Sequence, residues 1–549
     1  MDTHLTRRVR ASPVASRVVD RLARDDDEGG RRALLVVAFR DARRRTRRRR
    51  EFSSQRVTPD EPRDCGASTG AVERARARVV TVVVVITDRA TDLCFVFAQA
   101  PLTTDADSPL IRVFIREVVA ASRGKMTQTE RRALPAVLFL QGGPGFECAR
   151  PFEEGGWLAE LVKEHRVFLM DQRGTGMSSA ELTRARFDEG DGETLVEPDV
   201  NVASGSDASA ATRWASLLKC FRADAIVRDA ELFRKRALGE DVKWTLLGQS
   251  FGGFCITTYL SFAPEGVKEA LYTGGLPPLI DEEASALGAY TKLLNRVKTQ
   301  NEKFHARFPG DNERIHYLAR HIQEVDTPLP GGGSLSATHL RALGFSNLGT
   351  AQGMERLHYI LENVRVEPTG KAPLSKKLLI EIENAYRHFE TNALYAILHE
   401  SIYCSGANAY GAADEALRNR TEFDTVAGFA ADPSKQFLFT GEMVYESFFE
   451  DIHSLRPYRE IWRALAREEE WTTLYDVERL GANENIPVAC ASYVEDMFVD
   501  FDLAADTAAK ISGARVWSTS EYMHSGIREN GAVIVSKLLS YTRDEDPIR

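Results

Sequence analysis

Short apolar segments alternate with helix-length segments over most of this chain, and that alternation restricts the fold more than any other feature. Six short, largely apolar runs span residues 136–140, 167–170, 244–247, 270–272, 487–492 and 515–519. Strands that are buried on both faces and separated by helices form a parallel sheet. We therefore predict an α/β fold with a mostly parallel central sheet.

Two further segments complete the predicted organisation. Before the six runs, residues 78–87, 92–99 and 109–119 are rich in Val, Ile and Phe, which is typical of short strands. Between the fourth and fifth runs, residues 278–450 show helical patterning, for example over 376–399, and few strand signals. We predict an α/β core in two parts, residues 76–277 and 451–549, with a helical cap domain inserted over 278–450.

The first 50 residues differ in charge from the rest of the chain. They contain 16 Arg, no Lys and 7 acidic residues, whereas the whole chain has a net charge of −9. The dense arginines of residues 43–50 repel one another and offer no apolar periodicity to bury. We predict a disordered extension over residues 1–75. A polyanion-binding arm and an organelle-targeting segment are the alternatives, although acidic residues at 25–28 are unusual in a transit peptide.

Composition excludes several other classes of protein. The longest apolar runs are far shorter than the roughly 20 residues that a membrane helix needs, so no membrane partner is expected. Seven scattered cysteines without a Cys-x-x-Cys pair argue against a disulfide scaffold and against a zinc cluster. A reducing compartment, the cytoplasm, fits this usage best. The sequence does not indicate the oligomeric state.

A candidate nucleophile lies where an apolar strand meets a helix. The sequence from Trp244 runs through Gly248-Gln-Ser250-Phe-Gly252 into a helix-like segment at 254–261. This Gly-x-Ser-x-Gly context is typical of a nucleophile elbow, in which a strained turn exposes the serine hydroxyl and glycines allow the close backbone crossing. We predict that Ser250 is the nucleophile.

Such a serine needs a base and an acid, which in this architecture follow it in the order acid, then histidine. Asp496 follows the run 487–492, and His524 follows the run 515–519. We predict that His524 is the general base and that Asp496 orients it. Glu495 and Asp500 are the alternatives for the acid.

Oxyanion stabilisation requires backbone N–H groups close to the nucleophile. One is expected from Phe251, the residue after the serine, and the other from a glycine-rich loop after an earlier strand. Gln141-Gly-Gly143-Pro-Gly145 directly follows the run 136–140, so we predict Gly143 as the second donor.

Taken together, these motifs resemble the proline iminopeptidases, prolyl aminopeptidases of the α/β-hydrolase fold. The resemblance rests on Gly142-Gly-Pro-Gly-Phe-Glu147, on Asp171-Gln-Arg-Gly-Thr-Gly-Met-Ser-Ser179, on the serine motif and on the late Asp496 and His524. It extends from about residue 76 to the end of the chain. Gln141 stands where the family usually has His. In this interpretation Asp171 and Arg173 are structural braces near the site.

The resemblance implies a function and two further site residues. Family members release an N-terminal proline from peptides with a Ser-His-Asp triad, without a metal or other cofactor, and acidic residues of their cap hold the substrate's free amine. The segments around Glu400 and Glu442 look like the corresponding parts of the larger members, so both are expected to bind the amine. Both lie in apolar or aromatic sequence, which is unusual for solvated acids.

We therefore expect a serine aminopeptidase that acts on short peptides with an N-terminal proline. An esterase or another small-molecule hydrolase is the alternative among enzymes, because the same triad serves all of them. Nucleic-acid or polyanion binding through the Arg-rich segment is the alternative of another class, and nucleic acid is not the expected partner.

Overall fold

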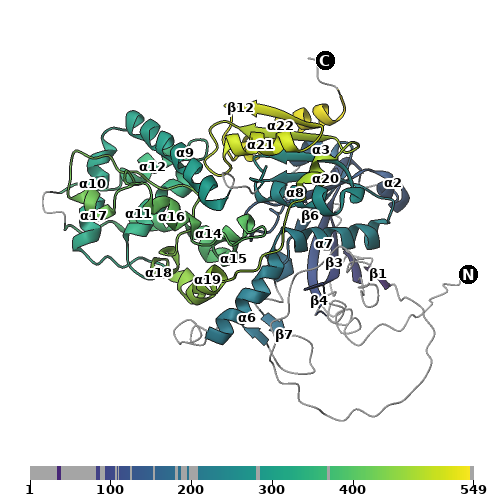
Figure 1. The fold of residues 1–549 in the computed structure, drawn as a ribbon, viewed down its shortest axis with the longest axis horizontal. Helices are drawn as coiled ribbons and strands as arrows, with labels where there is room; N and C mark the ends of the chain where they lie inside the picture. The colour runs from purple at the N-terminus through teal and green to yellow at the C-terminus, as the bar shows by residue number, and fades with distance from the viewer. Residues whose placement is uncertain are drawn as a thin grey trace, which may run out of the picture.

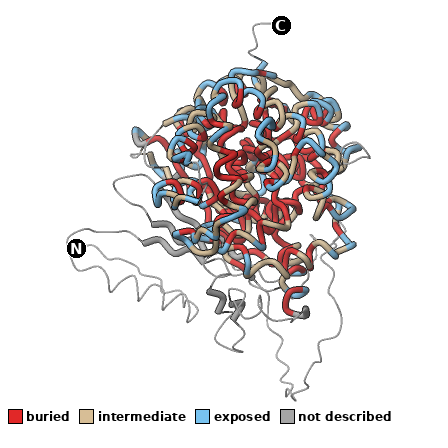
Figure 2. Tube along the Cα trace, turned by 90° about the vertical axis from the view of Figure 1, so that its left-hand side faces the viewer, coloured by how far each residue is buried: buried red, intermediate tan, exposed pale blue. Residues whose placement is uncertain are grey.

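The fold is known from a computed structural model, which describes residues 34–38, 82–86, 93–104, 108, 110–123, 126–151, 155–179, 184–186, 194–196, 208–279, 285–367 and 371–544. In these ranges an α/β core lies beside a large group of helices (Figure 1). Buried residues gather in the middle of the body, and exposed residues lie around them (Figure 2).

An eight-stranded sheet forms the core, in the order β12-β11-β10-β9-β5-β6-β4-β3. Neighbouring strands are parallel from β12 to β6, whereas β4 pairs antiparallel with both β6 and β3. This confirms the predicted mostly parallel sheet. The strands are β3 (Leu93–Pro101), β4 (Leu110–Val118), β5 (Ala136–Leu140), β6 (Arg166–Asp171), β9 (Trp244–Gln249), β10 (Val267–Thr273), β11 (Val488–Tyr493) and β12 (Ala514–Thr519).

Side chains of the central strands alternate between two hydrophobic cores, one on each face of the sheet. Leu138 of β5 packs in the core that holds α7 (Ala223–Phe233), α8 (Phe251–Phe262) and α21 (Phe501–Lys510). Its neighbour Phe139 packs in the core that holds α3 (Gly156–Val162) and α22 (Gly526–Thr542). Because consecutive side chains of a strand point to opposite faces, strands buried on both faces appear in the sequence as continuous apolar runs.

A helical region follows β10 and precedes β11, where the cap was predicted. It lies to one side of the sheet in Figure 1. Its elements are α9 (Ala286–Arg307), α10 (Asp311–Glu324), α11 (Ala337–Asn347), α12 (Gly353–Leu361), α13 (Lys376–Asn384), α14 (Arg387–Thr391), α15 (Ala393–Leu398), η5 (Glu400–Tyr403), α16 (Ala412–Arg418), α17 (Val426–Ala430) and α18 (Phe448–Asp451).

Helices continue beyond residue 450, the predicted end of the cap. They are η6 (His453–Tyr458), α19 (Arg459–Ala466) and α20 (Val477–Gly481), and β11 begins only at Val488. Of these, α19 packs against α6 (Ala208–Leu218) and α20 against α8, so this stretch lies against the core. The exact division of the chain into domains stays a prediction.

The segment 376–399, for which helical patterning was predicted, is helical but divided into α13, α14 and α15. Asn392 stands between the last two, with φ −137° and ψ 66°. Its side-chain amide donates to the carbonyl oxygen of Gly145 and to the carboxylate of Glu147, at 3.2 Å each. Both acceptors lie in the loop that follows β5, so the break brings this part of the chain to the edge of the sheet. Local periodicity in the sequence does not encode such a tertiary contact.

Smaller elements connect these parts. They are η1 (Ala121–Arg123), α2 (Gln128–Ala133), α4 (Gly176–Ser179), η2 (Lys219–Phe221), η3 (Arg234–Leu238), η4 (Pro264–Gly266), and the strands β7 (Arg184–Arg186) and β8 (Thr194–Val196), which pair with each other.

Near the N-terminus, β1 (Leu34–Ala38) pairs antiparallel with β2 (Val82–Ile86). The predicted extension did not include a strand at 34–38; the other residues of 1–75 lie outside the described residues. No helix within the described ranges is long and apolar enough to cross a membrane.

Candidate active site

Ser250 lies on a sharp turn between β9 and α8. Its backbone has φ 55° and ψ −126°, a conformation that costs a non-glycine residue energy and marks the elbow that the sequence predicts. A Cβ atom at Gly252 would lie 1.9 Å from the carbonyl oxygen of Leu140. Glycine is therefore required there for α8 to start this close to the end of β5, and the packing presses the elbow against the loop that follows β5.

His524 and Asp496 meet Ser250 from the loops after β12 and β11. His524 Nε2 lies 2.9 Å from Ser250 Oγ, and His524 Nδ1 lies 2.8 Å from Asp496 Oδ2. All three side chains are buried. The structure thus brings together three residues far apart in sequence, in the hydrogen-bonded order that a serine nucleophile, a base and an orienting acid require.

Asp496 is held in place by the turn that carries it. Its Oδ1 accepts hydrogen bonds from the amides of Phe498, at 2.7 Å, and Val499, at 3.1 Å, which leaves Oδ2 for the histidine. The Phe498 ring stacks on the His524 imidazole, with centroids 4.5 Å apart and an interplanar angle of 13°. Phe498 was missed by the sequence analysis, because only the fold places it on the histidine.

The two alternative acids have other partners. Glu495 binds Gln300 at 2.7 Å and Lys303 at 2.6 Å, both on α9. Asp500 is the N-cap of α21 and accepts from the Leu503 amide at 3.0 Å. Neither is placed to orient His524.

The glycine loop after β5 lies directly against the elbow. A Cβ atom at Gly142 would stand 3.0 Å from Ser250 Cβ and 2.5 Å from Gln249 Oε1, so only glycine fits. Gly143 follows with φ +130°, and Phe251, as the first residue of α8, has an amide that the helix itself leaves unpaired. One predicted amide donor is therefore in the glycine loop that contacts Ser250, and the other begins the helix that follows Ser250.

The residue before this loop is fixed through its main chain. The Gln172 side-chain amide donates to the Gln141 carbonyl oxygen at 2.9 Å. This hydrogen bond is made by the main chain of residue 141, so it does not depend on the side chain there. It can therefore form with Gln at this position as well as with the family's usual His.

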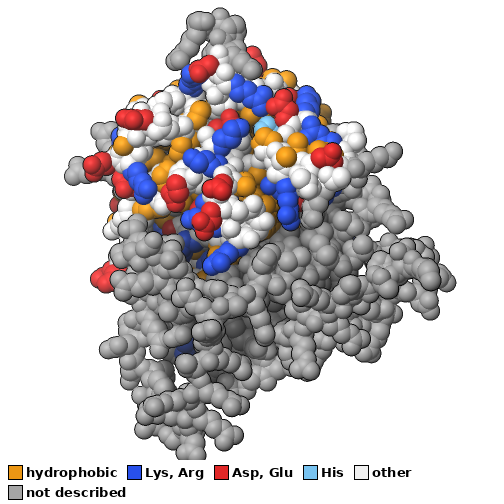
Figure 3. Space-filling model, turned by 90° about the vertical axis from the view of Figure 1, so that its right-hand side faces the viewer, with side chains coloured by type: hydrophobic (Ala, Val, Ile, Leu, Met, Phe, Trp, Pro, Cys, Tyr) orange, Lys and Arg blue, Asp and Glu red, His pale blue; other side chains and the backbone are white. Residues whose placement is uncertain are grey.

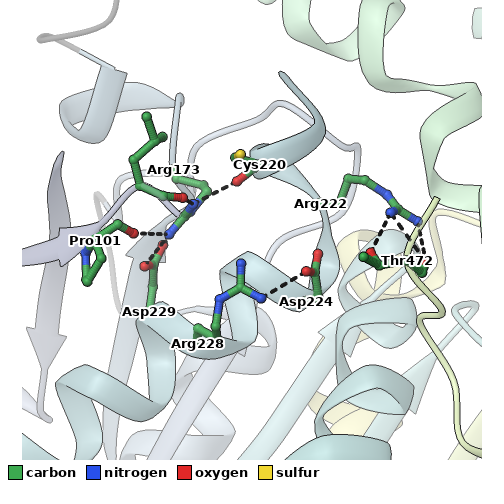
Figure 4. A network of polar contacts seen from close by, with 9 residues as sticks. Pro101, Arg173, Cys220, Arg222, Asp224, Arg228, Asp229 and Thr472 are labelled. Carbon is green, nitrogen blue, oxygen red and sulfur yellow. Dashed lines mark hydrogen bonds and ion pairs between the residues drawn. The ribbon is translucent and has the colours of Figure 1, made fainter. Parts of the chain in front are cut away.

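Asp171 and Arg173 are engaged in networks that hold the surrounding loops. Asp171 accepts two hydrogen bonds from Arg150, at 2.9 and 2.6 Å, and one from the Met177 amide at 2.9 Å. Arg173 makes a bidentate pair with Asp229, at 2.8 and 2.7 Å (Figure 4). It also donates to the carbonyl oxygens of Leu102, at 2.8 Å, and Cys220, at 2.7 Å. Both side chains contact loops rather than the triad.

Glu442 lies beside the triad, at the edge where the helical region faces the sheet. It is partly exposed and accepts a hydrogen bond from the Tyr395 hydroxyl. Burial raises the pKa of Glu442 to about 7, and the Tyr395 hydrogen bond and the positive charge of Arg528 act against that shift. An approaching cation would stabilise the ionised form of this carboxylate.

Glu400 is in a different environment. Its side chain is fully buried and accepts hydrogen bonds from the amides of Gly411, at 2.9 Å, and Ala413, at 3.1 Å, at the start of α16. Burial raises its pKa to about 8, although these two amides partly offset the effect. Glu400 thus already caps a helix, whereas within the described ranges the Glu442 carboxylate accepts one side-chain hydrogen bond, from Tyr395.

Tyr290 lies close enough to both glutamates for their charges to act on its hydroxyl. Its hydroxyl is buried and has no hydrogen-bond partner in the part of the chain that the structure describes. Burial raises its pKa well above the usual value, and the charges of Glu400 and Glu442 raise it further. Both carboxylates therefore lie within electrostatic range of one unpaired polar group. A hydroxyl of this kind could have been found only from the tertiary structure.

Within the described ranges, no cluster of three or more His, Cys, Asp or Glu side chains is placed to hold a metal ion.

Comparison with known proteins agrees with this architecture. Residues 135–321 match the family described as the alpha/beta hydrolase fold. A protein from Aeromonas sobria named proline iminopeptidase is 40% identical over 414 residues, which cover 75% of this chain and 88% of that protein. One from Aspergillus aculeatus, named proline iminopeptidase aneH, is 28% identical over 452 residues, or 81% and 92% of the two chains.

Among solved structures, a proline iminopeptidase from Mycobacterium smegmatis aligns at 12% identity with a TM-score of 0.35, covering 82% of this chain and all of the other. The sheet and the matched segment define an α/β hydrolase. The extent and identity of the match to the Aeromonas protein then show that the chain belongs to the proline iminopeptidase family, which confirms the resemblance seen in the sequence.

Proposed function

We propose that this protein is a serine aminopeptidase that releases N-terminal proline from short peptides. The hydrogen-bonded series Ser250, His524 and Asp496, with Glu442 beside it, is the observation that carries the proposal. Family membership supports the same reaction, because its named relatives are proline iminopeptidases.

In the first half of the reaction, Ser250 Oγ attacks the carbonyl carbon of the first peptide bond, and His524 Nε2 takes the hydroxyl proton. The amides of Phe251 and Gly143 stabilise the oxyanion as it forms. Asp496 holds the imidazole with Nδ1–H toward its carboxylate and stabilises the imidazolium. His524 then gives the proton to the departing nitrogen, which leaves a prolyl ester on Ser250.

In the second half, water attacks that ester while His524 removes one of its protons. The tetrahedral intermediate uses the same two amides, and its collapse returns the proton to Ser250 Oγ and releases free proline. The transfers between Ser250 Oγ and His524 Nε2 involve atoms that already lie 2.9 Å apart in the resting site.

An exopeptidase must also recognise the charged terminus of its substrate. We assign this role to Glu442 as the direct contact of the α-ammonium, with Glu400 as the second carboxylate of the same region. A carboxylate about 4 Å from an ammonium contributes about 4 kcal/mol at an effective dielectric constant of about 20, before desolvation is subtracted. An N-acylated substrate lacks this attraction.

One substrate panel tests the proposal: prolyl and other aminoacyl naphthylamides, N-acetylprolyl naphthylamide and a simple ester. Fast hydrolysis of the free prolyl compound, with little turnover of its N-acetyl form, is the expected result. Equal turnover of the free and N-acetylated compounds would contradict the aminopeptidase assignment, and turnover of the ester alone would favour an esterase.

We further propose that residues 1–75 are dispensable for catalysis.

We also propose that the enzyme works in the cytoplasm. The five cysteines with described side chains are all buried and free, in keeping with a reducing compartment; they are residues 148, 220, 255, 404 and 490. On the face in Figure 3, basic and acidic side chains are interspersed over the described surface, which does not resemble a polyanion-binding stripe. Salt-dependent nucleic-acid binding that disappears on deletion of 1–75 would support the alternative of another class.

A further inference from the structure

Arg528 is a cation beside the candidate active site to which the proposed mechanism gives no role. It follows His524 by four residues, on the first turn of α22. Its Nη1 lies 3.5 Å from Oε1 of Gln249, the residue directly before the nucleophile. The loop that carries the base thus leads directly into the helix that carries this guanidinium.

The guanidinium has no fixed partner of opposite charge. Among the described residues, no carboxylate oxygen lies within 4.0 Å of the guanidinium nitrogens, the distance that defines an ion pair. The one hydrogen bond of the guanidinium to these residues, to Gln249, is long. The neighbouring Glu529 is turned to the hydroxyl of Ser525 and, at 3.4 Å, to the amide of Ala351. An arginine stays charged at any physiological pH, so this charge is available to a ligand.

The Arg528 side chain is open to solvent beside the candidate site. It is exposed, its Nη1 lies 3.5 Å from Gln249 Oε1, and the surrounding protein lowers its pKa by desolvation. The charges of Glu442 and Glu529 lie close enough to act on the guanidinium and oppose that shift. Glu442 and Arg528 therefore present one negative and one positive group at the same site.

A peptide with a single residue after the scissile bond carries the matching pair of charges. In such a dipeptide the α-ammonium and the terminal carboxylate belong to residues whose Cα atoms are about 3.8 Å apart, one on each side of the scissile bond. In a longer peptide a peptide bond replaces that carboxylate, and in a peptide amide a carboxamide replaces it; both groups are uncharged. An arginine suits a carboxylate because its planar N–H groups can donate two parallel hydrogen bonds.

We propose that Arg528 binds the terminal carboxylate of the leaving residue and makes the enzyme selective for dipeptides with an N-terminal proline. The inference rests on the proposed function and deepens it: Glu442 recognises the first residue by its amine, and Arg528 recognises the second by its carboxylate. Arg528 is a specificity-determining residue here and takes no part in proton transfer.

Three substrates test the proposal: a prolyl dipeptide, the same dipeptide as its C-terminal amide, and prolyl naphthylamide. The expected result for Arg528→Gln is a fall of about 10- to 100-fold in kcat/KM for the free dipeptide, the range for a lost charged hydrogen bond. The two uncharged leaving groups should change by less than about threefold. Arg528→Lys should recover part of the loss, since it keeps the charge but not the two parallel donors.

Arg365→Gln is the matched control, because Arg365 is an exposed arginine in the loop after α12, and it should leave all three rates unchanged. An equal fall for all three substrates in Arg528→Gln would overturn the inference, since it would mean that Arg528 acts through Glu442 or the fold. An unchanged dipeptide-to-amide ratio would overturn it as well. If the wild type cleaves none of the three, the proposed function itself fails, and this inference fails with it.

Discussion

Neutralising Glu442 should separate the peptidase activity of this enzyme from its esterase activity. With the full attraction set at about 4 kcal/mol for a 4 Å pair, the partial exposure of Glu442 and the opposing charge of Arg528 reduce the expected loss to about 2–3 kcal/mol. At about 1.4 kcal/mol per tenfold change, Glu442→Gln should lower kcat/KM for prolyl naphthylamide by about 30- to 150-fold.

An uncharged ester provides the internal comparison. Its transition state uses Ser250, His524 and the two amides but offers no ammonium, so Glu442→Gln should leave its hydrolysis within a few fold of the wild type. Glu415→Gln, at an exposed position on α16, is the matched charge control. If Glu442→Gln lowers ester and naphthylamide hydrolysis equally, the carboxylate supports the fold or the triad, and the amine-binding assignment is wrong.

The same carboxylate predicts a pH dependence. Burial raises the pKa of Glu442 to about 7, so the charged form dominates above that pH and the attraction for the ammonium is lost as the pH falls through it. The ratio of kcat/KM for the free-amine substrate to that for the ester should therefore rise between pH 6 and pH 8. His524 affects both substrates and cancels in the ratio. In Glu442→Gln the ratio should be flat, and a ratio that still rises would point to another group.

Three other predictions follow from the contacts described. Ser250→Ala, His524→Ala and the double variant should have similar residual rates, because such residues act as a unit; a Ser250→Ala rate above a tenth of the wild type would exclude that serine as the nucleophile. Asp496→Asn should be severely impaired, whereas Asp500→Asn should lose no more than about 1 kcal/mol of stability at a helix cap, and the reverse outcome would reassign the acid. The buried Glu400 has a pKa of about 8 against an ordinary 4.5, so the folded state holds its proton more tightly and loses stability as the pH rises from about 4.5 to 8; thermal unfolding of Glu400→Gln should show a smaller decrease over that range.

The sheet was predictable because its strands are buried on both faces. The strand predicted at residues 136–140 has the same bounds as β5. A short apolar run between polar turns is compatible with few structures other than a buried strand. The cap was harder to predict in detail. A continuous helix over 376–399 fits the periodicity, but Asn392 ends one helix in order to bind the loop after β5, and no local pattern announces that contact.

The candidate site shows the same division. Ser250 was evident from its motif and His524 from its place after the last strand, because each position is set by the order of strands along the chain. Glu400 and Glu442 look alike in sequence, yet one caps α16 and the other faces the histidine. Arg528 had one signal in the sequence, its position four residues after His524, but that position does not reveal whether a nearby acid neutralises it.

The sequence by itself determined the parallel sheet, the elbow at Ser250 and the order of the triad, because burial on two faces and a strand-to-helix turn leave direct marks on neighbouring residues. Only the tertiary structure decided which acid meets the histidine, and that, among the described residues, Arg528 has no carboxylate within ion-pair distance. Those outcomes depend on distances between segments that are hundreds of residues apart, and a charge has a role in recognition only when the fold has left it unpaired.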